Sequence, residues 1–302
     1  MVHAHGINES NRLEQLEINR KKLSLVLFLI LVFAGVEVVG GLISNSLALI
    51  SDAGHMVLDA VAIALSLFAV HLSLKPSTAK NTYSFGRMEI VAAFINGITL
   101  MALAGYIVFE AVQRFQEPPV IKGGIMLAVA VVGMLINIIS AAMLWGSSHE
   151  NLNIKGAMFH ILGDLAGSVG AVIAAVIIIF TGFTLIDPVV SILIGLLIIR
   201  SSWVLLKESL HVLMEGVPKG YDSQEIVEKI KLIEDVVDVH DFHLWSITTG
   251  VVLLTAHVQV SGNVSGVKTL QHIVEMLEND YALSHSTIQI EDPAMNVCSI
   301  CC

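Results

Sequence analysis

One short motif occurs twice in the most apolar part of the chain. His55 and Asp59 are four residues apart, and so are His160 and Asp164. Residues four apart project from one face of an α-helix, so each pair would present an imidazole beside a carboxylate. Two imidazoles and two carboxylates can surround Zn²⁺ as a tetrahedron, because zinc accepts nitrogen and oxygen ligands without a geometric demand of its own. The four side chains are therefore a candidate zinc site.

This mixture of ligands suits a metal that must be released. Two aspartates would neutralise the dication in a low dielectric, and the histidines can take up protons when the metal leaves, since a free imidazole titrates near about 6.5. The alternative is that these groups only join helices by hydrogen bonds; the repetition of the pair favours the metal site. Asp52, one turn before His55, could line an access path or serve helix packing, and we interpret Glu37 and Asn137 as interior polar packing.

Long apolar runs carry these motifs. Of the 302 residues 55% are hydrophobic and 14% charged, with a mean hydropathy of +0.80. A bilayer core of about 30 Å needs roughly 20 apolar residues per helix, and an open β-sheet could not satisfy its edges in lipid. A charge inside that core costs at least about 2.5 kcal/mol, so the ionisable residues there need a partner or a function. The sequence predicts six transmembrane helices, over 23–43, 47–73, 88–114, 123–145, 155–183 and 187–206.

Charges between the spans predict the orientation. With the N-terminus in the cytosol, ten Lys and Arg lie on the cytosolic side and two on the other, as the positive-inside rule requires. Residues 1–22 contain acidic residues and no small-residue cleavage site follows them, which favours a retained cytosolic tail over a signal peptide. Residues 23–207 form the membrane domain, and residues 208–302 return to the cytosol.

The C-terminal third carries the entire net charge of −10. Residues 208–302 hold 4 Lys and Arg against 14 Asp and Glu, whereas residues 1–207 hold 12 of each class. This balance disfavours nucleic acid as a partner. Periodicity predicts a small α+β domain of order α-β-β-α-β, which metal or dimerisation would help to stabilise. Its elements are expected over 223–233, 236–248, 251–260, 267–278 and 286–291.

This domain has ligand types of its own. Strand residues alternate between faces, so one of His240 and His243 shares a face with His257: an even-length turn selects His240, and an odd one selects His243. The motif Cys298-x-x-Cys301 and the pair His3-x-His5 are weak signals alone, and a plain surface role is the alternative. Together they favour a cytosolic metal site. Its further candidate ligands are His285 and Glu291, on either side of the last predicted strand.

The sequence closely resembles the cation diffusion facilitator family of divalent-metal transporters, of the zinc, cobalt and cadmium efflux type. The resemblance rests on residues 45–59, 82–90, 160–164 and 239–248. It implies six transmembrane helices, a metallochaperone-like cytosolic domain, a homodimer, and exchange of metal for protons by alternating access.

The resemblance also assigns residues. It implies that His55, Asp59, His160 and Asp164 are the transport ligands, and it favours His240 over His243. Some relatives bring an N-terminal histidine motif onto the neighbour's C-terminal domain. The segment 146–155, with His149 as its one histidine, resembles the bacterial type, so we expect a bacterial inner membrane. The loop 76–87 lacks histidine and carboxylate, so we expect no metal there.

We therefore expect a Zn²⁺/H⁺ antiporter that exports zinc, with Cd²⁺ or Co²⁺ as further substrates and zinc also as a structural or regulatory ion. An intramembrane metalloenzyme is the competing class, but a catalytic zinc keeps an open position, and four ligands would close it. A membrane-anchored metal sensor would explain the cytosolic ligands and leave the intramembrane ones without a role.

Overall fold

The computed structural model describes residues 25–26, 28–73, 75–145, 152–248, 250–261 and 265–292. Contacts divide the chain into two units. The first comprises residues 1–64 and 96–203, and the second comprises residues 65–95 and 204–302.

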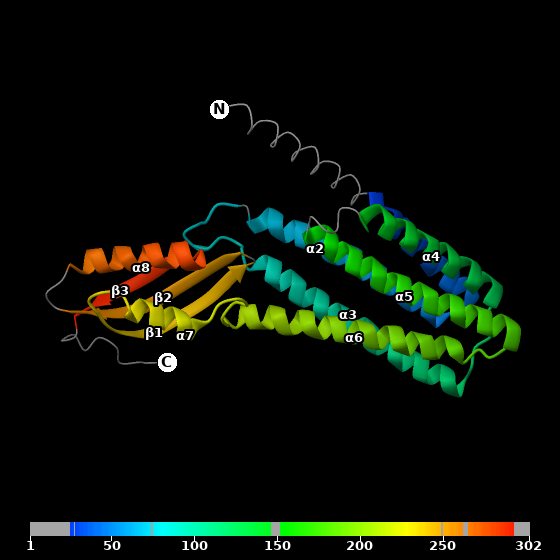
Figure 1. Cartoon of the computed structure of the whole chain (residues 1–302). Helices are drawn as coiled ribbons and strands as arrows, with labels where there is room; N and C mark the ends of the chain where they lie inside the picture. Colours follow the sequence, from blue (N-terminus) through cyan, green and yellow to red (C-terminus); the bar gives the residue numbers. More distant parts are fainter. Residues whose placement is uncertain are drawn as a thin grey trace, which may run out of the picture. The chain divides into compact units, whose positions relative to one another are not determined.

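Five helices of the described residues are long and apolar enough to cross a membrane (Figure 1). They are α2 (Leu47–Ser73), α3 (Met88–Gln116), α4 (Gly123–Trp145), α5 (Leu152–Thr181) and α6 (Ile186–Leu213). Of the first predicted span, 23–43, the described residues include the apolar helix Phe28–Ser44, and Leu25 and Val26 before it are helical as well. Among the described residues, five of the six predicted spans are thus long and apolar enough to cross a membrane.

Small residues fill the interior of the helical unit. The fully buried alanines Ala104, Ala130, Ala171 and Ala174 come from α3, α4 and α5 and belong to one apolar cluster. Small side chains let helix backbones approach closely, which is how helices associate where no water drives them together. Large apolar side chains such as Phe180 face outward, as a lipid environment allows. The same apolar runs therefore supply both a tight interior and an exterior suited to lipid.

The helix Phe28–Ser44 packs closely on α4 at two glycines. A Cβ atom added at Gly133 would lie 2.5 Å from Phe33 Cζ, and one added at Gly40 would lie 2.5 Å from Val129 Cγ2. Either contact is shorter than carbon atoms tolerate, so a larger residue at Gly133 or Gly40 would force the Phe33 or Val129 side chain to move. Each glycine forms a notch that receives a side chain of the other helix.

The C-terminal part of the second unit has the element order that the sequence predicts. It comprises α7 (Ser223–Lys231), β1 (Val236–Thr248), β2 (Val251–Val260), α8 (Gly266–Tyr281) and β3 (Ser286–Glu291). The sheet order is β1-β2-β3, with β1 antiparallel and β3 parallel to β2. Ile226, Ile230, Ile273 and Leu277 of the two amphipathic helices bury their side chains in one core with the sheet.

The largest difference from the predicted bounds concerns α6. This helix ends at Leu213 rather than at residue 206. Lys207 and Glu208 end the apolar run, but both are good helix formers and the backbone hydrogen bonds continue through them. Hydropathy therefore predicts the end of the apolar run, and the helix continues beyond it.

Candidate metal sites

The first candidate site begins on α2. His55 Nε2 lies 3.5 Å from Asp59 Oδ2, and the two side chains are 19% and 20% exposed. Their four-residue spacing places them on one face, as the sequence predicts. An imidazole and a carboxylate held this close offer two ligand atoms of the kind that zinc accepts.

The second half of this set lies on α5. Asp164 is buried, and His160 lies on the preceding turn of the same helix; its side chain is outside the described residues. Among the described side chains, the ligand atoms of His55, Asp59 and Asp164 do not form a group within 4.8 Å of one another. The described part of the bundle thus presents candidate ligands on two helices without gathering them into one compact group.

A buried carboxylate from α6 holds the start of α2. Asp187 accepts hydrogen bonds from Ser46 Oγ at 2.6 Å, Leu47 N at 2.8 Å and Ala48 N at 3.3 Å. The first N–H groups of a helix have no partner within the helix, so a carboxylate there satisfies them. Arg114 Nη1, 3.7 Å from Asp187 Oδ2, adds an opposite charge. Asp187 thereby fixes the helix that carries His55 and Asp59.

The interior residues Glu37, Asp52 and Asn137 differ in their surroundings. Asn137 donates from Nδ2 to Ser168 Oγ at 3.1 Å, as interior packing requires. Glu37 is 0% exposed and Asp52 4% exposed, and their side chains lie within hydrogen-bonding reach of each other. Glu37 therefore has a second acid as its neighbour, whereas we interpreted it from the sequence as interior polar packing.

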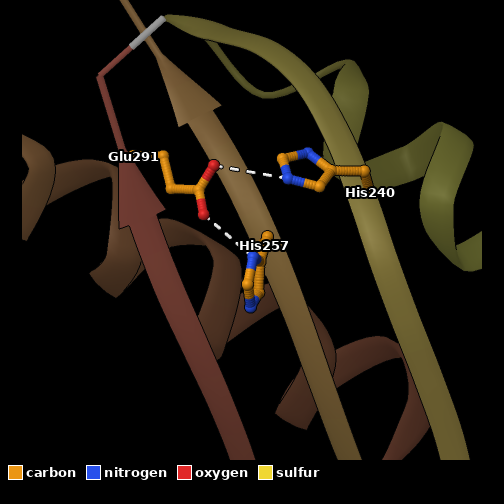
Figure 2. A group of neighbouring side chains, drawn as sticks. All are labelled: His240, His257 and Glu291. Carbon is orange, nitrogen blue, oxygen red and sulfur yellow. Dashed lines mark ion pairs between the residues drawn. The ribbon is translucent and has the colours of Figure 1, made fainter. Parts of the chain in front are cut away.

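The cytosolic sheet gathers a compact group of ligand types. His240 on β1 lies opposite His257 on β2, and Glu291 ends the adjoining β3. Glu291 Oε2 lies 3.3 Å from His240 Nε2, and Oε1 lies 2.8 Å from His257 Nδ1 (Figure 2). One ligand atom from each residue lies within 4.8 Å of the others. Among the described residues, this is the group that is close enough to hold a metal.

An irregularity in β1 decides which histidine faces His257. His240 pairs with His257, but His243 pairs with Thr255, so β1 contains one extra residue between them. Asp241, in that stretch, has φ of +50°, a left-handed conformation that fits a β-bulge. Its carboxylate lies 3.0 Å from His243 Nε2 and 3.5 Å from His257 Nε2. The register therefore selects His240, and Asp241 orients the second imidazole of the group.

The chemistry of this group suits a cation. Glu291 is 2% exposed and faces two partly exposed imidazoles, so it supplies one buried negative charge and the rings supply two neutral nitrogen ligands. Zinc accepts such a set and completes it with a fourth ligand. His285 is exposed and precedes β3, at the opposite end from Glu291. The other predicted cytosolic ligands, Cys298, Cys301, His3 and His5, lie outside the described residues.

Two parts of the chain match known protein families. Residues 23–214 match the cation efflux transmembrane domain, and residues 218–293 match the cytoplasmic domain of cation efflux proteins. The chain belongs to the cation efflux family. It is therefore a multi-pass membrane transporter of metal cations, and the alternative of an intramembrane metalloenzyme falls away.

Several relatives of this cation efflux protein are similar over nearly its whole length. The zinc transporter ZitB of Escherichia coli (strain K12) is 43% identical over 293 residues, which cover 96% of this chain and 93% of that protein. The metal cation efflux system protein CzcD of Cupriavidus metallidurans is 41% identical over 274 residues, or 90% and 87% of the two chains. A cadmium, cobalt and zinc/H⁺-K⁺ antiporter of Bacillus subtilis (strain 168) is 38% identical over 283 residues, or 92% and 91%.

One solved structure is similar to the cytosolic part. It is the metal-bound C-terminal domain of the CzcD transporter from Cupriavidus metallidurans, 32% identical. The match covers 24% of this chain and 99% of that structure, with a TM-score of 0.23.

Proposed function

We propose that this cation efflux protein exports Zn²⁺ from the cytosol in exchange for protons, by alternating access of one intramembrane site. The ligands would be His55, Asp59, His160 and Asp164. The observation that carries the proposal is the His55–Asp59 pair, held at 3.5 Å on α2 while α5 buries Asp164. The name of the E. coli relative, a zinc transporter, supports zinc as the substrate.

The charges of this site suit transport across a low dielectric. Two aspartates cancel the charge of the dication, which would otherwise lose its hydration without compensation. The histidines bind metal when neutral and protons when the metal leaves, so metal and proton compete for the same nitrogen atoms. The site is neutral both when it is loaded with zinc and when it is empty and protonated, so its access can change from one side of the membrane to the other in either state, as an antiporter requires.

The arrangement around this site follows from the same reasoning. We propose six transmembrane helices with both termini in the cytosol, in a bacterial inner membrane, because the positive-inside count favours that orientation. We also propose a homodimer. The Bacillus relative's name includes cadmium and cobalt, and we extend both to this chain as secondary substrates, since ligand type alone does not exclude them.

The cytosolic group has a different proposed role. His240, His257 and Glu291 would hold a zinc ion that stabilises the domain and its dimer or reports cytosolic zinc. Cys298, Cys301, His3 and His5 would supply further ligands from the tails, and His285 would serve a second site. The 4.8 Å grouping of three ligand atoms supports the first of these statements.

Flux in sealed proteoliposomes tests the transport proposal. Purified protein is reconstituted with a zinc indicator inside, and zinc is added outside with and without an outward proton gradient. We expect zinc entry that accelerates with the gradient and is matched by proton loss from the lumen. Protein-free vesicles give the leak. Zinc entry without proton movement would contradict antiport, and zinc binding without entry would favour the metal sensor.

A further inference from the structure

A buried acid of the first helix lacks the donors that a charged carboxylate needs. Glu37, on the helix Phe28–Ser44, is 0% exposed. No donor of the described residues gives a hydrogen bond to either of its carboxylate oxygens. The group within hydrogen-bonding reach is a second acid, Asp52 of α2. A charge on Glu37 would thus face another acid rather than a compensating cation of the described residues.

Asp52 connects this acid to the proposed transport site. It lies one turn before His55 on α2, and a Cβ atom added at Gly167 of α5 would lie 3.3 Å from Asp52 Oδ1. Gly167 is one turn after Asp164, whose charge also acts on Glu37. Among the described side chains, Asp52 and Asp164 are the titratable groups that act on Glu37. The acid pair therefore lies beside the proposed zinc ligands, from which it is distinct.

Two carboxylates this close cannot both carry a charge in a low dielectric. Like charges in contact repel, and the loss of hydration adds to the cost, so such a pair retains one proton between its oxygens. With that proton the Asp52 carboxyl group can donate to Glu37, whose oxygens accept no hydrogen bond from the other described residues. A metal ion is a poorer occupant, because hard cations require about six oxygen ligands.

We propose that Glu37 and Asp52 together hold one exchangeable proton, and that Zn²⁺ binding at the neighbouring ligands displaces it to solvent. This inference rests on the proposed zinc site. In the forward step the dication arrives and the shared O–H bond breaks; the proton leaves to water and offsets one of the two arriving positive charges. In the reverse step a proton from water reoccupies the pair as zinc departs. The pair is thus a counter-ion site that is separate from the histidines.

Proton release on zinc binding tests the proposal. Zinc is titrated into the detergent-solubilised full-length dimer by calorimetry in buffers of different ionisation enthalpy, which gives the protons released per zinc. The variant Glu37→Gln keeps the size and offers an amide donor to Asp52, but has no proton to lose. We expect unchanged zinc stoichiometry and about one proton fewer per zinc. Protons from the cytosolic ligands cancel in this difference.

Two controls make the result specific. Glu117→Gln removes an exposed carboxylate just after α3 and should release as many protons as the wild type. Asp59→Ala reports on the zinc site itself: if it binds and releases like the wild type, the proposed transport site is wrong, whatever Glu37 does. If Glu37→Gln does not elute as a folded dimer, Asp52→Asn repeats the test from the other side of the pair.

Infrared difference spectroscopy detects the proton directly and needs no zinc. The spectrum of metal-free wild type minus that of Glu37→Gln should contain the C=O stretch of a protonated carboxyl group, and zinc should diminish this band. An unchanged proton count together with the absence of this band would overturn the proposal. A band that persists at full intensity when zinc is bound would also overturn it, since the proton would then be structural.

Discussion

The two candidate metal sites both combine histidines with carboxylates but position them differently. In the cytosolic sheet, backbone pairing fixes His240 opposite His257, and one ligand atom from each lies within 4.8 Å of a Glu291 oxygen. In the membrane, helical spacing fixes each pair locally, but helical backbone hydrogen bonds stay within one helix and do not tie α2 to α5. We therefore expect a site built within one sheet to retain a metal, and a site divided between helices to be assembled and taken apart. The difference is the one expected between a structural ion and a transported ion.

The largest effect should come from the divided site. We expect Asp59→Ala or Asp164→Ala to reduce zinc flux to the protein-free leak, because the remaining three ligands lose a bond and half of the neutralising charge. The protein should still elute as a folded dimer. Vesicle flux and size-exclusion chromatography measure the two outcomes, with Glu117→Gln as the control. Wild-type flux in either variant would refute the assignment.

The second largest effect should come from lowering the pH, which should weaken zinc binding at the transport site. Protons compete with zinc for His55 and His160, so transport-site affinity should fall at least about tenfold from pH ~6.5 to ~5.5. The direction is fixed, because a histidine that gains a proton loses its lone pair for the metal. Calorimetry on a protein with His240→Ala and His257→Ala removes the compact cytosolic group from the measurement. Affinity that is constant over this range would contradict proton–metal exchange at these histidines.

Removal of the cytosolic ligands should loosen transport without abolishing it. We expect His240→Ala with His257→Ala to lower the bound zinc per protomer and the thermal stability of the full-length protein, because a bound metal stabilises the folded state that holds it. Cys298→Ser with Cys301→Ser should act in the same direction. Transport should continue at a reduced rate or with a shifted zinc dependence. His272→Ala, on α8 and outside the group, serves as the control. Equal zinc content in all variants would make these residues ordinary surface groups.

The cap on α2 should have a moderate effect. Asp187→Ala leaves Ser46 Oγ and two backbone N–H groups without an acceptor in the interior, which should cost about 2 kcal/mol of stability. Asp187→Asn retains one acceptor oxygen and should recover part of this loss. Thermal unfolding of the two variants in detergent measures the difference. Equal stability of Asp187→Ala and the wild type would exclude this cap as the anchor of α2.

The smallest effect concerns the surface of the cytosolic domain. The Lys231 ammonium, 3.0 Å from Asp238 Oδ1, lowers the pKa of this carboxyl group. A lowered pKa contributes stability that is present above the unfolded value of about 3.9 and is lost as the pH falls through the folded value. Lys231→Met should therefore cost up to about 1 kcal/mol near neutral pH and nothing in strong acid. Denaturant unfolding at several pH values tests this; a loss that persists in acid would point to packing instead.

Local spacing made much of this molecule predictable. The bounds of α2 and α4 coincide with the predicted spans, because each apolar run ends near a turn signal. The three strand ranges also coincide with the prediction. The choice between His240 and His243 could not be made from alternation alone, since the extra residue near Asp241 shifts the register. No local pattern marks such a bulge when the residue that adopts positive φ is not glycine.

The sequence could not predict which residues of distant helices lie in contact. Ser46 and Asp187 are 141 residues apart, and the partner of Glu37 is on another helix. An acidic residue that opens an apolar span, as Asp187 does, was the available signal for the cap. For Glu37, a charged residue type within a span indicated that a partner or a function was needed. Which residue is that partner depends on which helices pack together, and the sequence does not show this.

The two glycine notches limit how the membrane unit can move. If the first helix slid along α4 by about 1.5 Å, the rise of one residue, the Phe33 ring would leave the notch at Gly133 and press against Val129 or Ile136, which lie one turn away on the same face of α4. The notch at Gly40 blocks the same displacement at a second point. We therefore expect the two helices to move together as one rigid body. Any rocking that exposes the ion to one side of the bilayer and then to the other must use different helix boundaries as its sliding surfaces.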